Sequence, residues 1–222
     1  MNGYVFTFSG AELVALGSGA LWWRDHGLLC VSDLHLGKSE RIARRGGVSL
    51  PPYDTRATLD RLAADLDSCN PATVACIGDS FDDLESADAL PEYERLWIAR
   101  LQAGREWIWI EGNHDPGPVA LGGAHHAILR VGPLTFRHIA DPAAQAEVSG
   151  HYHPKVQLRL RGRTIARPAF LVDRDRIILP AYGVYTGGLR SDAGALCSLM
   201  RPDAIALVTG SSVYPVPMPR NA

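Results

Sequence analysis

The sequence has no apolar run near the roughly 20 residues that a membrane-spanning helix requires. Residues 1–10 contain neither a basic leader nor a continuous apolar stretch, so we expect no secretory signal and a cytoplasmic location. Hydrophobic residues make up 46% and charged residues 21% of the 222-residue chain, as in ordinary folded proteins. We therefore predict a folded protein without membrane spans, built as a single domain over residues 1–222.

The chain also has little net charge, because 22 basic residues face 24 acidic ones and leave a net charge of -2. A field of this size does not attract nucleic acid as a basic domain does, so any DNA binding must be local. Only Lys38 and Lys155 among the basic residues are lysines, and we give this bias no functional weight. The four cysteines form no Cys-x-x-Cys pair, and Cys30 and Cys76 lie in apolar runs. We predict that the cysteines are reduced core residues.

Strand-like and helix-like segments alternate in the first half of the chain. Short strand-like pieces come first, and after them we predict a buried strand at 28–32, a helix from Thr55, a strand at 73–77, a helix at 92–103 and a strand at 107–110. This alternation predicts a largely parallel sheet, in which ligands gather at the carboxyl ends of the strands.

The two helices are predicted from their apolar faces. In the first helix Asp54 or Thr55 acts as the N-terminal cap, and one face carries Leu59, Leu62, Ala63 and Leu66. In the second helix one side carries Tyr93, Leu96, Trp97 and Leu101, and Gly104 follows where a C-terminal glycine belongs. Each helix can therefore cover a sheet with one side.

The second half is rich in short β-like runs with turn signals between them, from Ala127 to Val208. These runs predict a second and more antiparallel sheet. We find no internal repeat, and the proline-rich end at 213–219 is interpreted as a tail. Both halves together indicate the α/β class.

Residues that can bind metal follow the first two of these strands. Asp33 and His35 are two positions apart, and in extended backbone such residues point to the same side and can reach one cation. Asp79 follows a glycine at the end of the next strand and can bridge two metals. Asp82 is placed to hydrogen-bond a ligand rather than to bind metal itself.

Further residues of this kind follow later strands. Asn113 and His114 come after the third strand, and His151 and His153 repeat the spacing of two after 146–149. The sequence thus predicts a cluster of aspartate, histidine and asparagine from four separate strand ends.

These residues form four ordered motifs that resemble those of the calcineurin-like metallophosphoesterase superfamily: Asp33-Leu34-His35, Gly78-Asp79-Ser80-Phe81-Asp82, Gly112-Asn113-His114-Asp115 and Gly150-His151-Tyr152-His153. The resemblance implies a dimetal site. One ion would be held by Asp33, His35 and His153, the other by Asn113, His151 and one more histidine, with Asp79 bridging both. It also implies that His114 stabilises the transition state or protonates the leaving oxygen, and that Asp115 orients His114.

The remaining histidine ligand has three candidates: His125, His126 and His138. We choose His138, because it follows the strand-like run at 134–137 and so lies at a strand end like the other ligands. The pair His125 and His126 is interpreted as a solvated loop. The mixed carboxylate, amide and imidazole set suits manganese, iron or zinc, and we expect manganese.

A closer resemblance covers most of the chain. Residues 33–38, Arg44, Gly46, Leu50-Pro51, Leu179-Pro180-Ala181-Tyr182-Gly183 and Thr186-Gly187-Gly188 are similar to those of bacterial ligase-associated DNA-damage-response phosphoesterases, or endonucleases. Those proteins are encoded near an ATP-dependent DNA ligase and a helicase, which implies association with such partners. That family often has a histidine where this chain has Asp82.

Basic residues occupy the long connection after the first two ligands, namely Lys38, Arg41, Arg44 and Arg45. Connections of this length are usually functional or disordered, so contact with a phosphate backbone is one interpretation. A solvated charged face is the other, because Glu40 lies among them. Tyr152 likewise can stack on a leaving group or simply pack.

We interpret the chain as a four-layer αββα sandwich of two mixed sheets that holds a dimetal phosphoesterase site. It would hydrolyse phosphodiester bonds by in-line attack of a metal-bound hydroxide, as a nuclease of DNA repair. Only residues 80–112 separate Asp79 from Asn113, which leaves no room for a large cap, and an open site admits polymers. Two alternatives stay open: a small-molecule phosphomonoesterase or pyrophosphatase acting on a nucleotide or lipid precursor, and a non-catalytic scaffold of a repair complex. The oligomeric state is not predicted.

Overall fold

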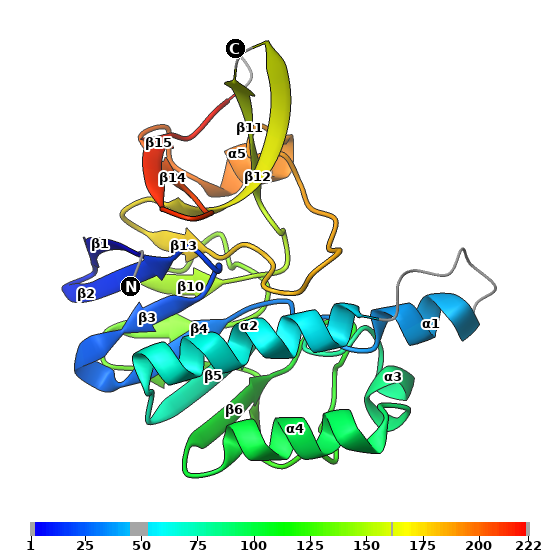
Figure 1. The fold of residues 1–222 in the computed structure, drawn as a ribbon. Helices are drawn as coiled ribbons and strands as arrows, with labels where there is room; N and C mark the ends of the chain where they lie inside the picture. The colour runs from blue at the N-terminus through cyan, green and yellow to red at the C-terminus, as the bar shows by residue number, and fades with distance from the viewer. Residues whose placement is uncertain (1–2, 45–52, 161, 221–222) are drawn as a thin grey trace.

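Two β-sheets pack face to face in the computed structural model, which describes residues 3–44, 53–160 and 162–220 (Figure 1). The first sheet has the order β1-β2-β3-β4-β5-β6-β7. Its strands are β1 (Gly3–Phe8), β2 (Ala11–Leu16), β3 (Leu21–Trp23), β4 (Leu28–Val31), β5 (Thr73–Ile77), β6 (Glu106–Ile110) and β7 (Ala124–His126). Neighbours from β4 to β7 are parallel, which confirms the predicted parallel arrangement, and those from β1 to β4 are antiparallel.

The second sheet has the order β15-β14-β12-β13-β10-β9-β8, and β11 pairs with β12. Its strands are β8 (Leu129–Val131), β9 (Leu134–Phe136), β10 (Glu147–Ser149), β11 (Lys155–Leu160), β12 (Arg163–Val172), β13 (Arg176–Ile178), β14 (Ile205–Val208) and β15 (Tyr214–Pro217). The pairs of β10 with β9 and with β13 are parallel and the other pairs are antiparallel. The prediction of a second, more antiparallel sheet is confirmed.

Helices cover the outer faces of both sheets and complete the predicted αββα sandwich. They are α1 (Lys38–Arg44), α2 (Asp54–Cys69), α3 (Leu84–Asp88), α4 (Glu92–Gln102) and α5 (Gly194–Leu199), with a short 3-10 turn at Arg24–His26. The first sheet lies under α2 and α4, whereas among the described helices the second is covered by the short α5. Among the described residues, no helix combines the length and the apolar character of a membrane span.

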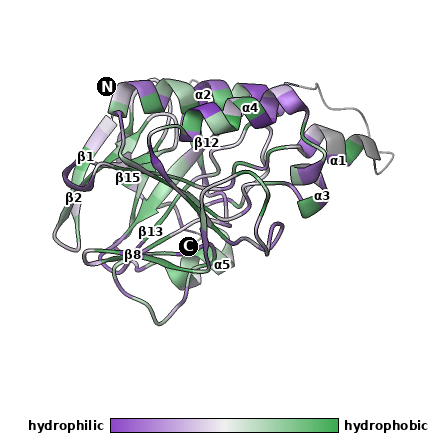
Figure 2. Cartoon of the chain, turned by 90° about the horizontal axis from the view of Figure 1, so that it is seen from below, coloured by the Kyte–Doolittle hydropathy of each residue, from purple (hydrophilic) through white to green (hydrophobic). Residues whose placement is uncertain are grey.

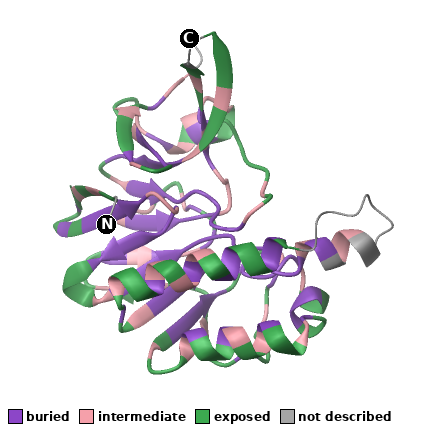
Figure 3. Cartoon of the chain, in the orientation of Figure 1, coloured by how far each residue is buried: buried purple, intermediate pink, exposed green. Residues whose placement is uncertain are grey.

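The strands that carry the site are buried on both faces (Figure 3). In β5, Val74 and Cys76 face the core under α2 and α4, and Ala75 and Ile77 face the core between the sheets. A strand buried in this way reads as a continuous apolar run, as the sequence does at 73–77. The strand ends are therefore held firmly on both sides. All four cysteines are free, and those of β4 and β5 are fully buried.

Helix α2 packs as its periodicity predicts, but it begins differently. Leu59, Leu62 and Leu66 are buried against the first sheet. The predicted cap is wrong, because the N-cap is Tyr53 and it makes no capping bond with its side chain. The carboxylate of Asp54 instead accepts hydrogen bonds from the backbone N–H of Ser39 (3.1 Å) and from its hydroxyl (2.6 Å). These bonds hold α1 against the start of α2.

Helix α4 begins where predicted and ends one residue earlier, and only part of its predicted face meets the sheet. Leu101 is buried and Trp97 packs against the core as predicted, whereas Tyr93 and Leu96 are 55% and 62% exposed and Ile98 is buried in addition. Apolar residues occur on two sides of this helix, so periodicity alone cannot choose between them, and packing against the first sheet decides. Along α2 and α4, apolar and polar stretches are interspersed (Figure 2).

Two segments predicted to be irregular are strands. His125 and His126 belong to β7, which pairs with β6, rather than to a loop. The proline-rich end is not a tail, because β15 pairs with β14. Pro215 and Pro217 are tolerated there because β15 lies at the edge of its sheet and does not need every backbone N–H for pairing.

Candidate metal centre

The loops after β4 and β5 are joined by backbone hydrogen bonds. Asp33 N–H donates to the Gly78 carbonyl (3.2 Å), and His35 N–H donates to the Asp79 carbonyl (2.9 Å). Because the strands are adjacent and parallel, these bonds extend the sheet beyond its last regular residues and fix the side chains of both loops side by side.

Five of the predicted site residues have left-handed backbone, which side chains other than glycine rarely adopt. Their φ angles are 54° at Asp33, 46° at His35, 44° at Asp79, 71° at His151 and 47° at His153. The premise that Asp33 and His35 converge through extended backbone is therefore wrong, since both lie beyond β4. Such strained conformations gather at functional sites, where the surrounding bonds hold them.

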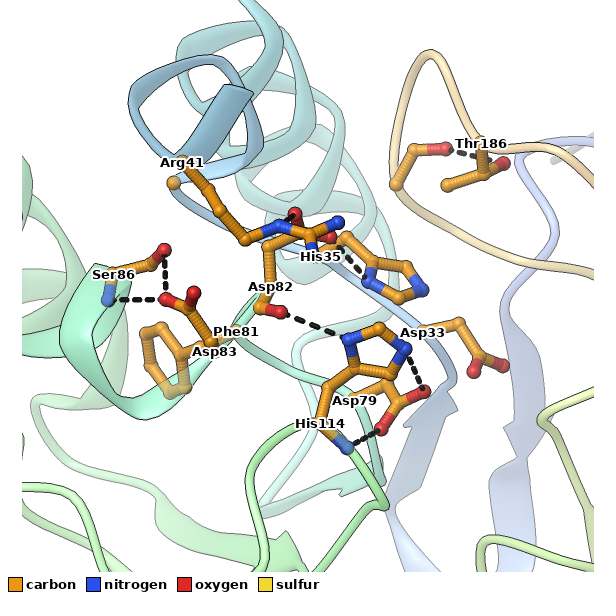
Figure 4. Close-up of polar contacts among 12 residues, drawn as sticks. Asp33, His35, Arg41, Asp79, Phe81, Asp82, Asp83, Ser86, His114 and Thr186 are labelled. Atoms are coloured by element: carbon orange, nitrogen blue, oxygen red, sulfur yellow. Dashed lines mark hydrogen bonds and ion pairs between the residues drawn. The ribbon is translucent and has the colours of Figure 1, made fainter. Parts of the chain in front are cut away.

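A first donor group consists of Asp33, His35 and His153, whose ligand atoms lie within 4.8 Å of one another. His153 Nε2 is 3.1 Å from Asp33 Oδ1 and 3.4 Å from His35 Nε2. His35 Nδ1 pairs with Asp82 Oδ1 at 3.0 Å, so the proton lies on Nδ1 and the Nε2 lone pair faces the group. The other Asp82 oxygen accepts from Arg41 Nε (Figure 4).

A second donor group consists of Asp79, His138 and His151, and Asn113 adjoins it. His138 Nδ1 is 3.2 Å from the carbonyl of Ile77, which assigns the proton to Nδ1. His138 Nε2 is then an acceptor, and it lies 3.3 Å from Asp79 Oδ2, 3.2 Å from His151 Nδ1 and 3.0 Å from Asn113 Oδ1. His138, the histidine chosen from the sequence, thus lies together with Asp79, Asn113 and His151.

Both groups fit metal ions, because carboxylate oxygens and imidazole nitrogens converge in each. Nitrogen lone pairs and carboxylate oxygens at such distances repel one another unless a proton or a metal cation lies among them. Imidazole nitrogens mixed with hard oxygens suit manganese, iron or zinc better than calcium.

The carboxylates of the centre are ionised at neutral pH. Burial alone would raise the pKa of Asp33, but the hydrogen bond and charge of His153 hold the pKa below its usual value. Burial acts in the same direction on Asp79, yet His138 and His114 lower the pKa of Asp79 to about 2. For Asp82 the lowering of the pKa against burial comes from His35 and Arg41. Each carboxylate therefore offers a negative charge to a cation.

The model of the calcineurin-like phosphoesterase family matches residues 27–177. The chain belongs to this family. Among solved structures, the nuclease MPE of Pseudomonas putida is similar, with 25% sequence identity and a TM-score of 0.74 over 97% of this chain and 100% of that chain. A comparison with curated proteins gives no match. The chain is therefore a metal-dependent phosphoesterase hydrolase.

In this phosphoesterase His114 lies beside the second donor group. Its backbone N–H donates to Asp79 Oδ1 (2.9 Å), and its Nε2 is 4.0 Å from Asp79 Oδ2. Its Nδ1 pairs with the backbone carbonyl of Asp82 at 2.9 Å. This carbonyl, and not Asp115, orients the ring, so the predicted orienting role of Asp115 is wrong.

Asp115 braces the loop that carries Asp79. Its carboxylate accepts from the backbone N–H groups of Ser80 (2.8 Å), Phe81 (3.1 Å) and Gly112 (3.0 Å). Burial, together with the charge of Asp79, raises the pKa of Asp115 to about 6, although the three bonds oppose the shift. Because backbone N–H groups already occupy its carboxylate, Asp115 stabilises this loop and does not hold the ring of His114.

At two motif positions only glycine fits, because side chains of other loops approach the backbone too closely for a Cβ atom. A Cβ on Gly78, which has a φ of +78°, would lie 2.1 Å from His138 Nδ1. A Cβ on Gly150 would lie 1.7 Å from the hydroxyl of Ser32 and 2.6 Å from Asp33 Oδ2. Each glycine thus lets a ligand of one strand pack directly on the loop of another.

The predicted substrate-binding residues are only partly placed. Arg41 reaches Asp82 rather than open solvent. Lys38 begins α1 and Arg44 ends it, whereas Arg45 lies outside the described residues, as do Gly46, Leu50 and Pro51. The half-buried Tyr152 has its ring 5.0 Å from that of His151, edge to face.

The segment Tyr182–Gly183 supports the loop after β4. Tyr182 N–H donates to the Ser32 carbonyl (2.8 Å), and Gly183 N–H donates to the Asp33 carbonyl (3.1 Å). The buried hydroxyl of Tyr182 donates to Asp65 of α2 (2.8 Å). The run from Pro180 to Gly183 marks this segment in the sequence, but nothing in the run itself says that it supports a metal ligand.

Proposed function

We propose that this phosphoesterase is a nuclease that hydrolyses phosphodiester bonds in DNA with two bound metal ions. The observation that carries the proposal is the pair of donor groups at one edge of the sandwich, with the His114 ring beside them. The similarity to a nuclease over nearly the whole chain supports it.

The proposed ligands divide between the two ions as the donor groups do, with Asp79 serving both: Asp33, His35 and His153 for one ion, and Asn113, His138 and His151 for the other. Two such ions, when bound, supply a nucleophile at neutral pH and neutralise charge on the phosphoryl oxygens. We propose manganese as the working metal, with iron and zinc as the ions to compare.

His114 is the proposed acid. Its Nδ1 is held by the Asp82 carbonyl, and the side chain is 35% exposed, so the free Nε2 can reach a substrate. In its protonated form it would donate from Nε2 to the phosphoryl group and pass the proton to the leaving oxygen. The ring needs no large movement, because the backbone of Asp82 and the bond to Asp79 already fix it.

The segment between Asp79 and Asn113 supports a polymeric substrate. Between Asp79 and Asn113 the chain forms α4 and β6, which belong to the sandwich itself, and the five-residue α3, which lies beside α1 (Figure 1). No cap is therefore formed from this segment. A strand of nucleic acid can lie across such an edge, whereas enzymes of small phosphomonoesters usually enclose their substrates.

Two finer statements stay predictions of the family resemblance: a role in DNA repair with a DNA ligase and a helicase as partners, and a cytoplasmic location. They are tested by co-purification from cells rather than by the geometry of the centre.

The decisive assay uses a 5′-phosphorylated, 3′-labelled single-stranded oligonucleotide with Mn²⁺, and separately with Fe²⁺ and Zn²⁺. We expect internal fragments with the wild type and with Asp60→Asn, an exposed aspartate on α2 that serves as the matched control. Asp79→Asn should give none. An unchanged oligonucleotide, or loss of the terminal phosphate alone, would contradict the proposal and favour a small substrate or a monoester.

A further inference from the structure

A hollow of about 390 Å³ opens directly beside the metal centre. Asn113 and His138 line it, and both also contribute to the second donor group. Ile139 follows His138 in the chain and lines the same hollow. The hollow therefore adjoins the metal centre and shares two proposed ligands with it.

The walls of this hollow are mainly apolar. Ile128 and Ile139 line it and are 37% and 46% exposed, and Ala127 and Pro116 add further apolar surface. Single exposed apolar residues are ordinary on a surface. Two isoleucines exposed together in a concave site that adjoins a catalytic centre indicate a ligand that buries them.

The charges around the hollow argue against a second phosphate subsite. Arg137 lines it, but its guanidinium is paired with Asp141 (3.1 Å) and with the buried Glu147 (3.2 Å). Glu111 in the wall is exposed and adds a negative charge. A phosphate would meet a neutralised arginine and a free carboxylate, whereas an uncharged planar ring would meet two isoleucines.

We propose that this hollow binds the nucleobase of the nucleotide next to the scissile phosphate, and that Ile128 and Ile139 are the side chains that contact its ring. The inference rests on the proposed nuclease function, because the base can reach the hollow only when the phosphate of the same strand lies at the metals. The subsite supplies binding, so it acts mainly on KM and sets how strongly the enzyme depends on a base at that position.

The test is a scan in which one abasic residue is moved along a strand of fixed sequence. For the wild type we expect kcat/KM at a given linkage to fall about tenfold when the abasic residue takes the position that the hollow serves. The double variant Ile128→Ser/Ile139→Ser should have a kcat/KM lowered by a similar factor on the intact strand, through a higher KM. The abasic residue should lower the kcat/KM of this variant no further. Val5→Ser, an exposed apolar residue on β1, is the matched control and should behave as the wild type.

The same strands are also bound to these variants in the Asp79→Asn background and followed by fluorescence anisotropy, which gives a readout without turnover. If the loss of kcat/KM caused by the double variant and the loss caused by the abasic residue simply add, the variant still senses the base. That result would overturn the base subsite, and a protein partner or a second copy would then be the occupant of the hollow. If the double variant is misfolded, the scan on the wild type still decides, because a strand that tolerates abasic residues at every position overturns the proposal. A wild type that cleaves no oligonucleotide would overturn the nuclease function itself.

Discussion

The two donor groups of the metal centre are oriented by different parts of the molecule. In the first group, the ring of His35 is held by the carboxylate of Asp82, and Asp82 is held in turn by Arg41 of α1. In the second group, the ring of His138 is held by the backbone carbonyl of Ile77 at the end of the buried strand β5. One half of the centre thus depends on side chains and the other on the sheet itself.

A side-chain substitution can therefore change the orientation of the histidine in the first donor group more easily than in the second. The Ile77 carbonyl belongs to a strand that is buried on both faces, so no side-chain replacement removes it. Asp82 is 1% exposed and Arg41 is 21% exposed at their side chains, and both can be changed without replacing a proposed ligand. Partners of this kind set the orientation and basicity of ligating histidines.

The largest effect is expected from Asp79→Asn, which should abolish the difference between the two halves. Asp79 contacts His138 and lies beside His114, and it is proposed to serve both ions. We expect activity to fall to the level of the uncatalysed reaction and both ions to be bound more weakly. Activity and metal content are measured together, with Asp60→Asn as the control, and a variant that retains both ions would count against the shared role.

His114→Gln should leave both halves intact and remove only the proton donor. We expect kcat to fall by about 100-fold, a typical loss for a general acid. Metal content should equal that of the wild type, because His114 is not among the proposed ligands. A variant with lowered metal content, or with full activity, would contradict the role assigned to its Nε2.

Asp82→Asn should separate the halves. The replacement keeps the shape but removes the charge that faces His35, so we expect the first ion to be bound about tenfold more weakly. The second ion should be bound as before, since His138 does not contact Asp82. Titration of the metal-free protein with Mn²⁺ by calorimetry resolves the two affinities, and equal losses at both sites would remove the distinction.

Arg41→Met should give the smallest effect in the same direction. Arg41 acts on His35 only through Asp82, and its side chain is partly exposed, so we expect a loss of about twofold to fivefold in affinity for the first ion. Arg56→Met on α2 replaces an exposed arginine and is the matched control. If Arg41 instead contacts DNA, the variant will raise KM for oligonucleotides and leave metal affinity unchanged.

The sequence predicts the parallel neighbouring strands and the polar residues that meet beyond their ends. Apolar runs such as 73–77 define strands that are buried on both faces, and the polar residues that follow parallel neighbouring strands must meet at one edge. The choice of His138 follows from the same rule, because it comes after β9 as His151 comes after β10. The motif glycines Gly78 and Gly150 are explained by the structure, because side chains of neighbouring loops pack directly on their backbone.

The remaining features depend on tertiary packing that no local pattern records. The side of α4 that meets the sheet is decided by Ile98 and Leu101, although Tyr93 and Leu96 have the same spacing. Asp115 follows His114 in the chain, but its carboxylate turns to the backbone of another loop. The base subsite likewise joins Ile128 after β7 with Ile139 after β9, two residues that are unremarkable in the sequence.

If each of the two donor groups binds one metal ion, the metal content of the protein shows it directly. Wild-type protein, His35→Ala and His151→Ala are saturated with Mn²⁺, freed of excess metal by gel filtration and analysed by plasma mass spectrometry. We expect two ions per chain for the wild type and one for each variant, with His35→Ala emptying the first group and His151→Ala the second. A wild-type chain that retains a single ion or none, or variants that retain both, would contradict it.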